Sequence, residues 1–267
     1  MNPSAPSHST APDREKILVR GVNWLGDAVL SVPALQRLRE AKPRARLVLL
    51  APEKLAGLWE GQPFLDELLL FSPADNLWQT ARRLRAQNFS AAVAFPNSLR
   101  SALELWLAGI PQRAGRARPG RSLLLTIPVP PRPGAAPMRR RSVGEIRRLI
   151  ARAESPPPIP PSAHHLHDYL QLVSALGASS EPLPPRIAIS QEEAEKTAAR
   201  LGLPSARADR PFLGMNPGAE YGPAKRWPAA SFVAAGIAIH QATGCRWIIF
   251  GGPAEREIAH WIATGLG

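Results

Sequence analysis

The sequence has little cysteine and no long apolar run. Cys245 is the single cysteine among 267 residues, which excludes a fold held together by disulfides. The first residues do not form the charged-then-apolar pattern of a signal peptide, and we therefore expect a cytoplasmic protein. No apolar run reaches the roughly 20 residues that a membrane-spanning helix needs, so we expect no membrane span. Apolar residues make up 45% of the chain, which is typical of a globular protein.

Acidic residues are also scarce. Asp and Glu number 21 against 33 Lys and Arg, which gives a formal net charge of +12. This excess predicts an acidic partner: a nucleic acid, an anionic membrane surface or a phosphorylated substrate. Aromatic residues are few and are not interleaved with the arginines, so base stacking is not favoured and we expect no nucleic-acid partner.

Metal-ligand patterns are missing as well. No cluster of Asp residues suggests a divalent cation site. His164, His165 and His167 do not share one helical face, and no cysteine or acidic cluster joins them. We interpret the three histidines as part of a linker or hinge and expect no metal site.

Short apolar runs alternate with helical patterns along the chain, which predicts an α/β fold with a parallel, doubly wound sheet. Residues 1–14 are polar and Pro-rich and are interpreted as a disordered tail. In residues 15–153 we expect a Rossmann-like domain. Its expected strands are 17–20, 46–51, 67–71 and 91–95, and its expected helices are 28–41, 53–59, 77–87 and 98–108.

The composition changes in the middle of the chain. Between residues 113 and 152 there are eleven arginines against one acid, Glu145, and six prolines that break any long regular element. We expect this segment to be mobile and strongly cationic. A Pro-rich linker with a helix is expected over 154–183, and a partial second Rossmann-like domain over 184–267. The expected elements there are strands 186–189, 211–215 and 247–250, with helices 192–201, 228–241 and from 254 onward.

The stretch 216–228 joins an expected strand to an expected helix and contains Gly218 and Gly222. Glycines let the backbone approach a ligand, and the free amides and dipole at a helix N-terminus attract anions. Lys225 and Arg226 would add positive charge for a pyrophosphate. Either basic residue alone is also typical of a solvated surface loop.

The whole string Asn-Pro-Gly-Ala-Glu-Tyr-Gly-Pro-Ala-Lys-Arg-Trp-Pro at 216–228 resembles the phosphate-binding loop of the bacterial ADP-heptose:lipopolysaccharide heptosyltransferases, especially the heptosyltransferase II branch. The Gly26-Asp27 turn and residues 97–115 resemble the same family. This resemblance implies the GT-B fold, with two Rossmann-like domains facing a cleft and the second one incomplete. It also implies a metal-independent, inverting transfer of L-glycero-D-manno-heptose from ADP-heptose to a heptose of the lipopolysaccharide inner core.

Asp27 follows a buried strand at the start of a helix, where an Asp either caps the helix or belongs to a site at the sheet edge. In the resembling family an Asp of this turn is the general base, which implies that Asp27 accepts the proton of the acceptor hydroxyl. Asn97 and Ser98 follow a strand and suit helix capping, and the resemblance adds an acceptor-binding role. Arg113 begins the basic segment and is a further candidate for acceptor binding.

The resemblance also implies where the donor binds. Gly218, Ala219 and Lys225 would hold the donor phosphates and stabilise the departing diphosphate without a metal or cofactor. An acid after the last expected strand would contact the ribose. Glu255 and Glu257 are both candidates, or simply solvated charges in a first helical turn, and we prefer Glu255.

Several expectations extend past the site itself. The family continues into an Asp-(Ser/Thr)-Gly-x-x-His motif that is not in this sequence, so we expect a fragment or a C-terminally truncated chain. The implied acceptor is lipid-anchored, which places the protein peripherally at the cytoplasmic face of the inner membrane, with the arginines recruiting it. One alternative is a related transferase that uses another sugar nucleotide. Another is an inactive fragment that only binds an anionic surface.

Overall fold

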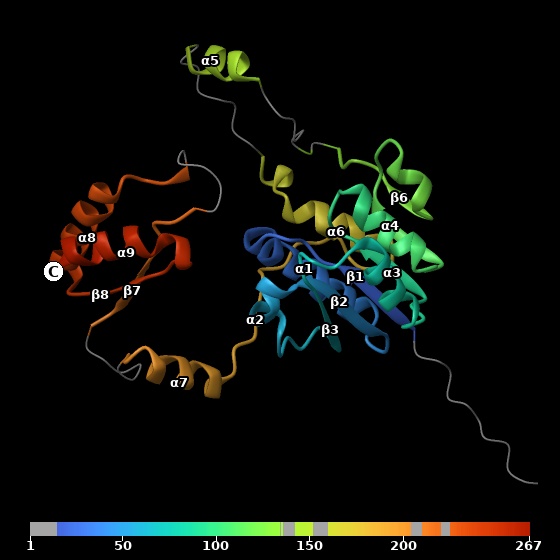
Figure 1. Cartoon of the computed structure of the whole chain (residues 1–267), viewed down its shortest axis with the longest axis horizontal. Coiled ribbons are helices and arrows are strands. Elements are labelled where there is room, and N and C mark those ends of the chain that lie inside the picture. The colour runs from blue at the N-terminus through green and yellow to red at the C-terminus, as the bar shows by residue number, and fades with distance from the viewer. Residues whose placement is uncertain (1–14, 134, 136–141, 152–159, 204–209, 220–224) are drawn as a thin grey trace, which may run out of the picture. The chain divides into compact units, whose positions relative to one another are not determined.

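A computed structural model describes residues 15–133, 135, 142–151, 160–203, 210–219 and 225–267 (Figure 1). The expected tail, residues 1–14, lies outside the described residues. The chain divides into two compact units, Met1–Ile189 and Ser190–Gly267. Both units contain parallel strands joined through helices, as the alternating sequence pattern predicted.

The first unit is built on a six-stranded parallel sheet with the order β3-β2-β1-β4-β5-β6. The strands are β1 Lys16–Arg20, β2 Arg46–Pro52, β3 Glu67–Phe71, β4 Ala91–Ala94, β5 Gln112–Arg116 and β6 Ile127–Val129. β1 is central, since Ile17 is in register with Leu47 of β2 on one side and with Ala91 of β4 on the other. This is the Rossmann order, and the chain switches direction across the sheet beside β1, where ligand sites of such folds form.

The first unit contains nine helical elements in its described residues. They are α1 Leu25–Ala41, η1 Glu53–Leu55, α2 Ala56–Trp59, α3 Leu77–Arg85, α4 Leu99–Leu107, η2 Arg121–Leu124, α5 Val143–Ala151, η3 Pro161–Ala163 and α6 Leu166–Ser174. Helices cover both faces of the sheet, and α5 is not among them because none of its residues is buried. Successive strand residues face opposite layers. Ile17 and Val19 belong to the core cluster that includes α1 and α6, whereas Leu18 packs with α3 and α4. No helix in the described parts of the chain has the length and apolarity to span a membrane.

The end of the first unit differs from the sequence expectation. Residues 186–189, all of them described, form no strand, so the strand expected there is wrong. Ala188 instead exchanges two hydrogen bonds with the Gln62 side chain: its amide donates to Oε1 at 2.9 Å, and its carbonyl accepts from Nε2 at 3.1 Å. The side-chain amide thus satisfies the backbone groups that a neighbouring strand would have satisfied. α6, expected in a linker, packs against α1 within the first unit.

The Arg-rich stretch contains short regular elements between its prolines. β5 and β6 extend the sheet there, and α5 follows. Pro128 lies in β6, the edge strand, where a residue without an N–H leaves no ladder bond unmade. Gly115 of β5 leaves room for a buried arginine, since a Cβ there would lie 3.0 Å from Nη1 of Arg121.

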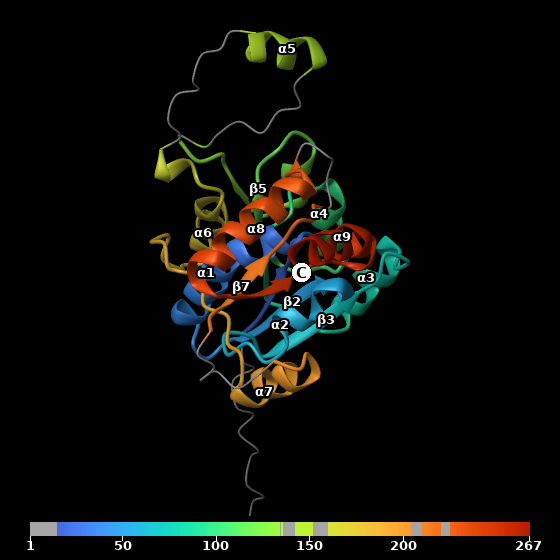
Figure 2. The same ribbon diagram turned by 90° about the vertical axis from the view of Figure 1, so that its left-hand side faces the viewer.

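The second unit has a β-α-β core. β7 Phe212–Met215 and β8 Arg246–Ile249 are parallel and are joined through α8 Ala229–Thr243. The remaining elements are α7 Gln191–Arg200, η5 Pro253–Glu255 and α9 Arg256–Leu266. α8 and α9 lie side by side (Figures 1 and 2) because a glycine is present at the crossing: a Cβ on Gly236 would lie 2.5 Å from Cδ2 of Leu266.

Candidate functional site

Asp27 lies at the carboxyl edge of the sheet in the first unit. α1 was expected to begin at residue 28 but begins at Leu25. Asp27 therefore lies inside the first helical turn. The N-cap position belongs to Trp24, whose side chain makes no capping bond, and Asp27 is therefore not the cap. A carboxylate in this turn is favoured by the helix dipole. About a third of the Asp27 side chain, 34%, stays exposed, so it can meet a ligand.

His165 is the residue that sequence reasoning missed. Its Nδ1 lies 3.9 Å from Oδ1 of Asp27, and its Nε2 lies 3.9 Å from Oδ2 of Asp168. The imidazole thus lies between the carboxylates of Asp27 and Asp168. The i,i+3 spacing of His165 and Asp168 is readable in the sequence, but the approach to Asp27 depends on α6 packing against α1. Within the described residues no group of three or more His, Cys, Asp or Glu is placed to hold a metal ion.

Tyr169 forms the floor beneath this imidazole. The two rings stack with centroids 4.9 Å apart, and Phe95, just after β4, packs on the other side at 5.2 Å. Burial, and then the charges of Asp27 and Asp168, raise the pKa of the Tyr169 phenol well above its usual value. Tyr169 is therefore neutral at any physiological pH. It links the end of β4 to the turn that carries Asp27.

Asp168 is held from the opposite side by Arg116 at the end of β5. The Arg116 guanidinium donates to Oδ1 of Asp168 at 2.7 Å and to the Gln171 side chain at 2.9 Å. Side chains of both residues are mostly buried, at 9% and 24% exposure, so water screens this pair only partly. Arg116 thereby fixes the face of α6 that His165 and Tyr169 present to Asp27.

Asn97 and Ser98 follow β4, and both are exposed. Ser98 caps α4 by accepting a hydrogen bond from the Ser101 amide at 3.2 Å, as its residue type predicted. The Ser98 carbonyl accepts in turn from Nε of Arg121 at 3.0 Å. Arg121 is buried, and its pKa is lowered to about 10 by burial and by neighbouring Arg118 and Arg116. A buried cation thus secures the loop that presents Asn97.

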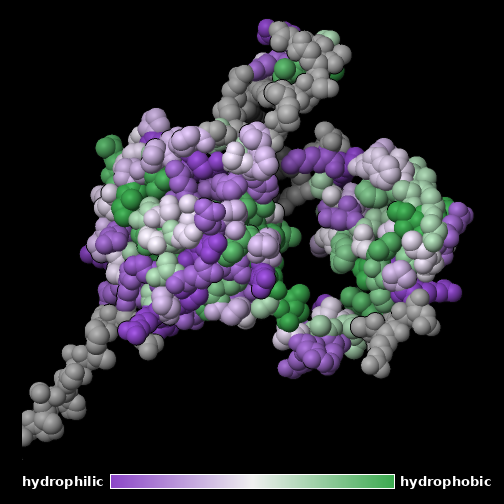
Figure 3. Space-filling view, turned by 180° about the vertical axis from the view of Figure 1, so that it is seen from behind, coloured by the Kyte–Doolittle hydropathy of each residue, from purple (hydrophilic) through white to green (hydrophobic). Residues whose placement is uncertain are grey.

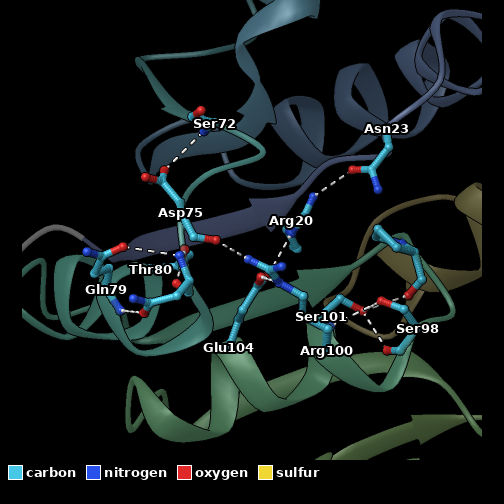
Figure 4. Close-up of polar contacts among 12 residues, drawn as sticks. Arg20, Asn23, Ser72, Asp75, Gln79, Thr80, Ser98, Arg100, Ser101 and Glu104 are labelled. Atoms are coloured by element: carbon cyan, nitrogen blue, oxygen red, sulfur yellow. Dashed lines mark hydrogen bonds and ion pairs between the residues drawn. The ribbon is translucent and has the colours of Figure 1, made fainter.

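A second buried cation, Arg20, lies under the same edge (Figure 4). It is the last residue of β1, and its Nε donates to Oε2 of Glu104 at 2.9 Å. Its Nη1 donates to the Gly21 carbonyl at 2.7 Å and to Asn23 Oδ1 at 3.3 Å. Glu104 also accepts from Arg100 at 3.0 Å. The turn leading to Asp27 is therefore tied directly to α4.

Arg113 is not brought together with these residues. It lies near the beginning of β5, whereas Asp27, Asn97 and Ser98 follow the ends of strands that run parallel to it. Its guanidinium donates to the backbone carbonyls of Leu124 at 2.8 Å and of Ile110. The structure places Arg113 at the amino edge of the sheet, where it holds a loop.

The second unit carries the glycine-rich turn. Gly218 and Ala219 follow β7, and residues 220–224 of the loop lie outside the described part. Lys225 is exposed, and Arg226 donates from Nη2 to the Ala219 carbonyl at 3.0 Å. α8 begins after Pro228, its N-cap, so its N-terminal amides and dipole are available close to the loop. The expected strand and helix are confirmed.

Glu255 is brought against this turn. A Cβ on Gly218 would lie 2.1 Å from Oε1 of Glu255, so glycine is the residue that leaves room for the carboxylate. The other carboxylate oxygen accepts from the Gly252 amide at 2.5 Å. Glu255 also lines an open hollow with Gly251, Gly252 and His260. Glu257 is exposed on α9.

A protein-family model for glycosyltransferase family 9 (heptosyltransferase) matches residues 77–267. The chain belongs to this family. The match includes two of the motif regions, 97–115 and 216–228, and the resemblance expected from them is confirmed. This family 9 chain is therefore a glycosyltransferase.

Named relatives agree with the family. This family 9 chain is 28% identical over 258 residues to lipopolysaccharide heptosyltransferase 2 of Escherichia coli K12, with 94% of this chain and 67% of that protein covered. It is 27% identical over 266 residues to lipooligosaccharide heptosyltransferase 2 of Haemophilus ducreyi, with 94% and 67% covered. The solved structure of E. coli ADP-heptose LPS heptosyltransferase II matches with a TM-score of 0.73 at 25% identity, over 94% of this chain and 69% of that one. The GT-B fold is thereby confirmed.

Changing Glu104 to Gln in this glycosyltransferase should lower the free energy of unfolding by about 3–5 kcal/mol, because two arginines would lose their anionic partner and one of them is buried. Urea denaturation measures the change. The control is Glu40→Gln, which breaks a half-exposed pair with Arg37 and should cost about 1 kcal/mol or less. Equal losses in the two variants would contradict the importance of the buried network.

Titration by ultraviolet absorbance should show the Tyr169 phenol ionising well above the ordinary pKa of a tyrosine, 10.0. The folded state keeps a proton that the unfolded chain releases, so the free energy of unfolding should fall as the pH rises above 10.0. Tyr169→Phe should remove the late transition and flatten this decline. An unchanged titration above pH 10.0 in Tyr169→Phe would contradict the placement of Tyr169.

Proposed function

We propose that this family 9 glycosyltransferase transfers L-glycero-D-manno-heptose from ADP-heptose to a heptose of the lipopolysaccharide inner core. The observation that carries the proposal is Asp27, a partly exposed carboxylate in the first turn of α1 at the carboxyl edge of a Rossmann sheet. The names of the relatives support the substrate class, since two of them are lipopolysaccharide or lipooligosaccharide heptosyltransferases and the solved structure is named for ADP-heptose.

Asp27 would act as the general base. The acceptor hydroxyl oxygen attacks the anomeric carbon of the donor, the bond from that carbon to the diphosphate oxygen breaks, and ADP leaves with the bonding electrons. The hydroxyl proton passes to the Asp27 carboxylate. A single displacement inverts the anomeric centre. The Nδ1 of His165 lies 3.9 Å from this carboxylate and would border it as it accepts the proton.

The second unit would bind the donor. The amides of Gly218 and Ala219, the N-terminus of α8 and the Lys225 ammonium would stabilise the diphosphate as its charge develops. These groups supply positive charge without a metal ion, and we propose a metal-independent reaction. Glu255 would accept hydrogen bonds from the ribose hydroxyls, and its contact with Gly218 supports a ribose site adjoining the phosphate site.

Asn97 and Ser98 would contact the acceptor, because both are exposed beside the edge that carries Asp27. The proposed acceptor is a lipid-anchored saccharide that bears phosphate and carboxylate groups. A net charge of +12 suits such an anionic partner. We propose that the protein works in the cytoplasm, peripherally on the anionic inner face of the inner membrane.

Asp27→Asn should reduce the transfer rate by about 10²–10⁴-fold, because the amide cannot accept the acceptor proton. Donor binding should persist, since the groups proposed to hold the diphosphate lie in the second unit. Transfer is measured with ADP-heptose and a heptose-bearing core acceptor, and binding by the thermal shift that ADP produces in the same variant. Transfer at the wild-type rate would show that Asp27 is not the general base.

Lys225→Ala should weaken donor binding. ADP and ADP-heptose should raise the melting temperature of the wild-type chain, because a ligand that binds the folded state stabilises it, whereas UDP should not. The shift should shrink in Lys225→Ala. The matched control is Lys196→Ala, which removes an exposed lysine of α7 paired with Glu192 on the surface. A full ADP shift in Lys225→Ala would exclude this lysine from the donor site, and equal shifts with UDP would count against an adenine nucleotide donor.

A further inference from the structure

α5 is an amphipathic helix whose apolar face is uncovered. No residue of the helix is buried, and four of its apolar side chains are exposed. They are Val143 at 66%, Ile146 at 44%, Leu149 at 45% and Ile150 at 75%. Spacings of three and four residues place these side chains on one face of the helix. In Figure 3 their region, at the top of the view, shows apolar atoms beside hydrophilic ones.

The sequence specifies where this helix begins. The Ser142 side chain accepts a hydrogen bond from the Glu145 amide at 3.2 Å, and its carbonyl accepts from the Ile146 amide at 3.0 Å. The helix itself has nine residues. Isolated helices shorter than about 12–15 residues are marginal in water, and most helices in proteins depend on packing of their apolar face. With that face uncovered, α5 needs a partner to be stable.

The charges around the face identify the kind of partner. Arg147 lies four residues after Val143 and three before Ile150, so it borders the apolar face. Arg148 is also exposed. From residue 139 to residue 152 the sequence holds six arginines and one acid. An apolar stripe bordered by arginines complements a surface that is apolar beneath and anionic above, which is the interface of an anionic bilayer.

Other partners fit this pattern less well. A second copy of the chain would place arginines against arginines, and the like charges would repel. A nucleic acid would pair with the arginines but would leave the four aliphatic side chains in water. An anionic lipid surface accepts both, since arginine side chains can reach the headgroups while their neighbours enter the acyl region.

We propose that α5 is a membrane-surface anchor: it lies in the interface of a bilayer that contains anionic lipids, with Val143, Ile146, Leu149 and Ile150 inserted. The inference rests on the proposed function for its purpose, because the acceptor proposed above is carried by a lipid. The anchor holds the chain on the leaflet where that lipid is present. It turns a bimolecular search in solution into a search along the surface.

Sedimentation of the full chain with vesicles tests the anchor. Vesicles of phosphatidylglycerol and phosphatidylethanolamine should bind the wild-type chain, and vesicles of phosphatidylcholine should bind it at least tenfold more weakly. The double variant Ile146→Asp, Ile150→Asp should lose at least tenfold in affinity for the anionic vesicles. Its melting temperature should match the wild type, because α5 contributes no buried residue. Replacing both Arg147 and Arg148 with Gln should cost about fivefold for each charge and reduce the salt dependence.

The matched control is Leu123→Asp, which places the same charge on an exposed apolar position of η2, 87% exposed, and should bind vesicles like the wild type. The proposed anchor is wrong if the wild-type chain does not bind anionic vesicles or binds both vesicle types equally. It is also wrong if the Ile146→Asp, Ile150→Asp variant binds anionic vesicles as tightly as the wild type. An equal loss in Leu123→Asp would overturn it too. Vesicle binding requires neither donor nor acceptor, and transfer to a lipid-free acceptor should be unchanged in the double variant. A failure of the anchor is therefore distinguishable from a failure of the proposed function.

Discussion

Arg20 carries a positive charge to the end of the central strand, where its side chain is only 5% exposed. Removing a charge from water costs several kcal/mol unless other groups compensate. Glu104, the Gly21 carbonyl, Asn23 and the ring of Phe71 at 4.3 Å all compensate here. Because these groups come from three different segments, the turn after β1, α4 and β3, the segments are fixed with respect to one another. The turns at the sheet edge are ordered around this one guanidinium.

The same logic recurs across that edge. Arg121 secures the loop after β4, and Arg116 secures α6 through Asp168. Several arginines of this basic chain are therefore structural: they hold backbone carbonyls and carboxylates from within. Among the described residues, the ionic neighbour of Asp27 is a histidine, His165, and not an arginine. The Asp27 carboxylate stays partly exposed. Rigid surroundings and an accessible carboxylate together suit a base that must meet a mobile acceptor.

The sequence predicted the elements that depend on local pattern, and tertiary contacts decided the rest. Parallel strands buried on both faces are apolar runs, so the four strands preceding the Arg-rich segment could be read directly. The 186–189 run has strand composition, but Gln62 satisfies its backbone instead of a neighbouring strand. His165 looked like part of a hinge because its neighbour Asp27 is far away in the sequence. Arg113 was expected to bind the acceptor, yet its guanidinium binds nearby backbone carbonyls. The sequence alone does not show which arginines make such internal hydrogen bonds.

The contact between Gly218 and Glu255 has a consequence for how this protein can vary. One residue belongs to the turn after β7 and the other to the turn after β8, and there is no space between them for a methyl group. Residues in contact give non-additive effects when both are changed. A larger residue at 218 would have to displace the Glu255 carboxylate, the far end of a flexible side chain, or be accompanied by a shorter residue at 255. The phosphate end and the ribose end of the proposed donor site are therefore coupled, because a change at either position alters the space open to the other. A library that varies both positions together would sample combinations that single changes miss.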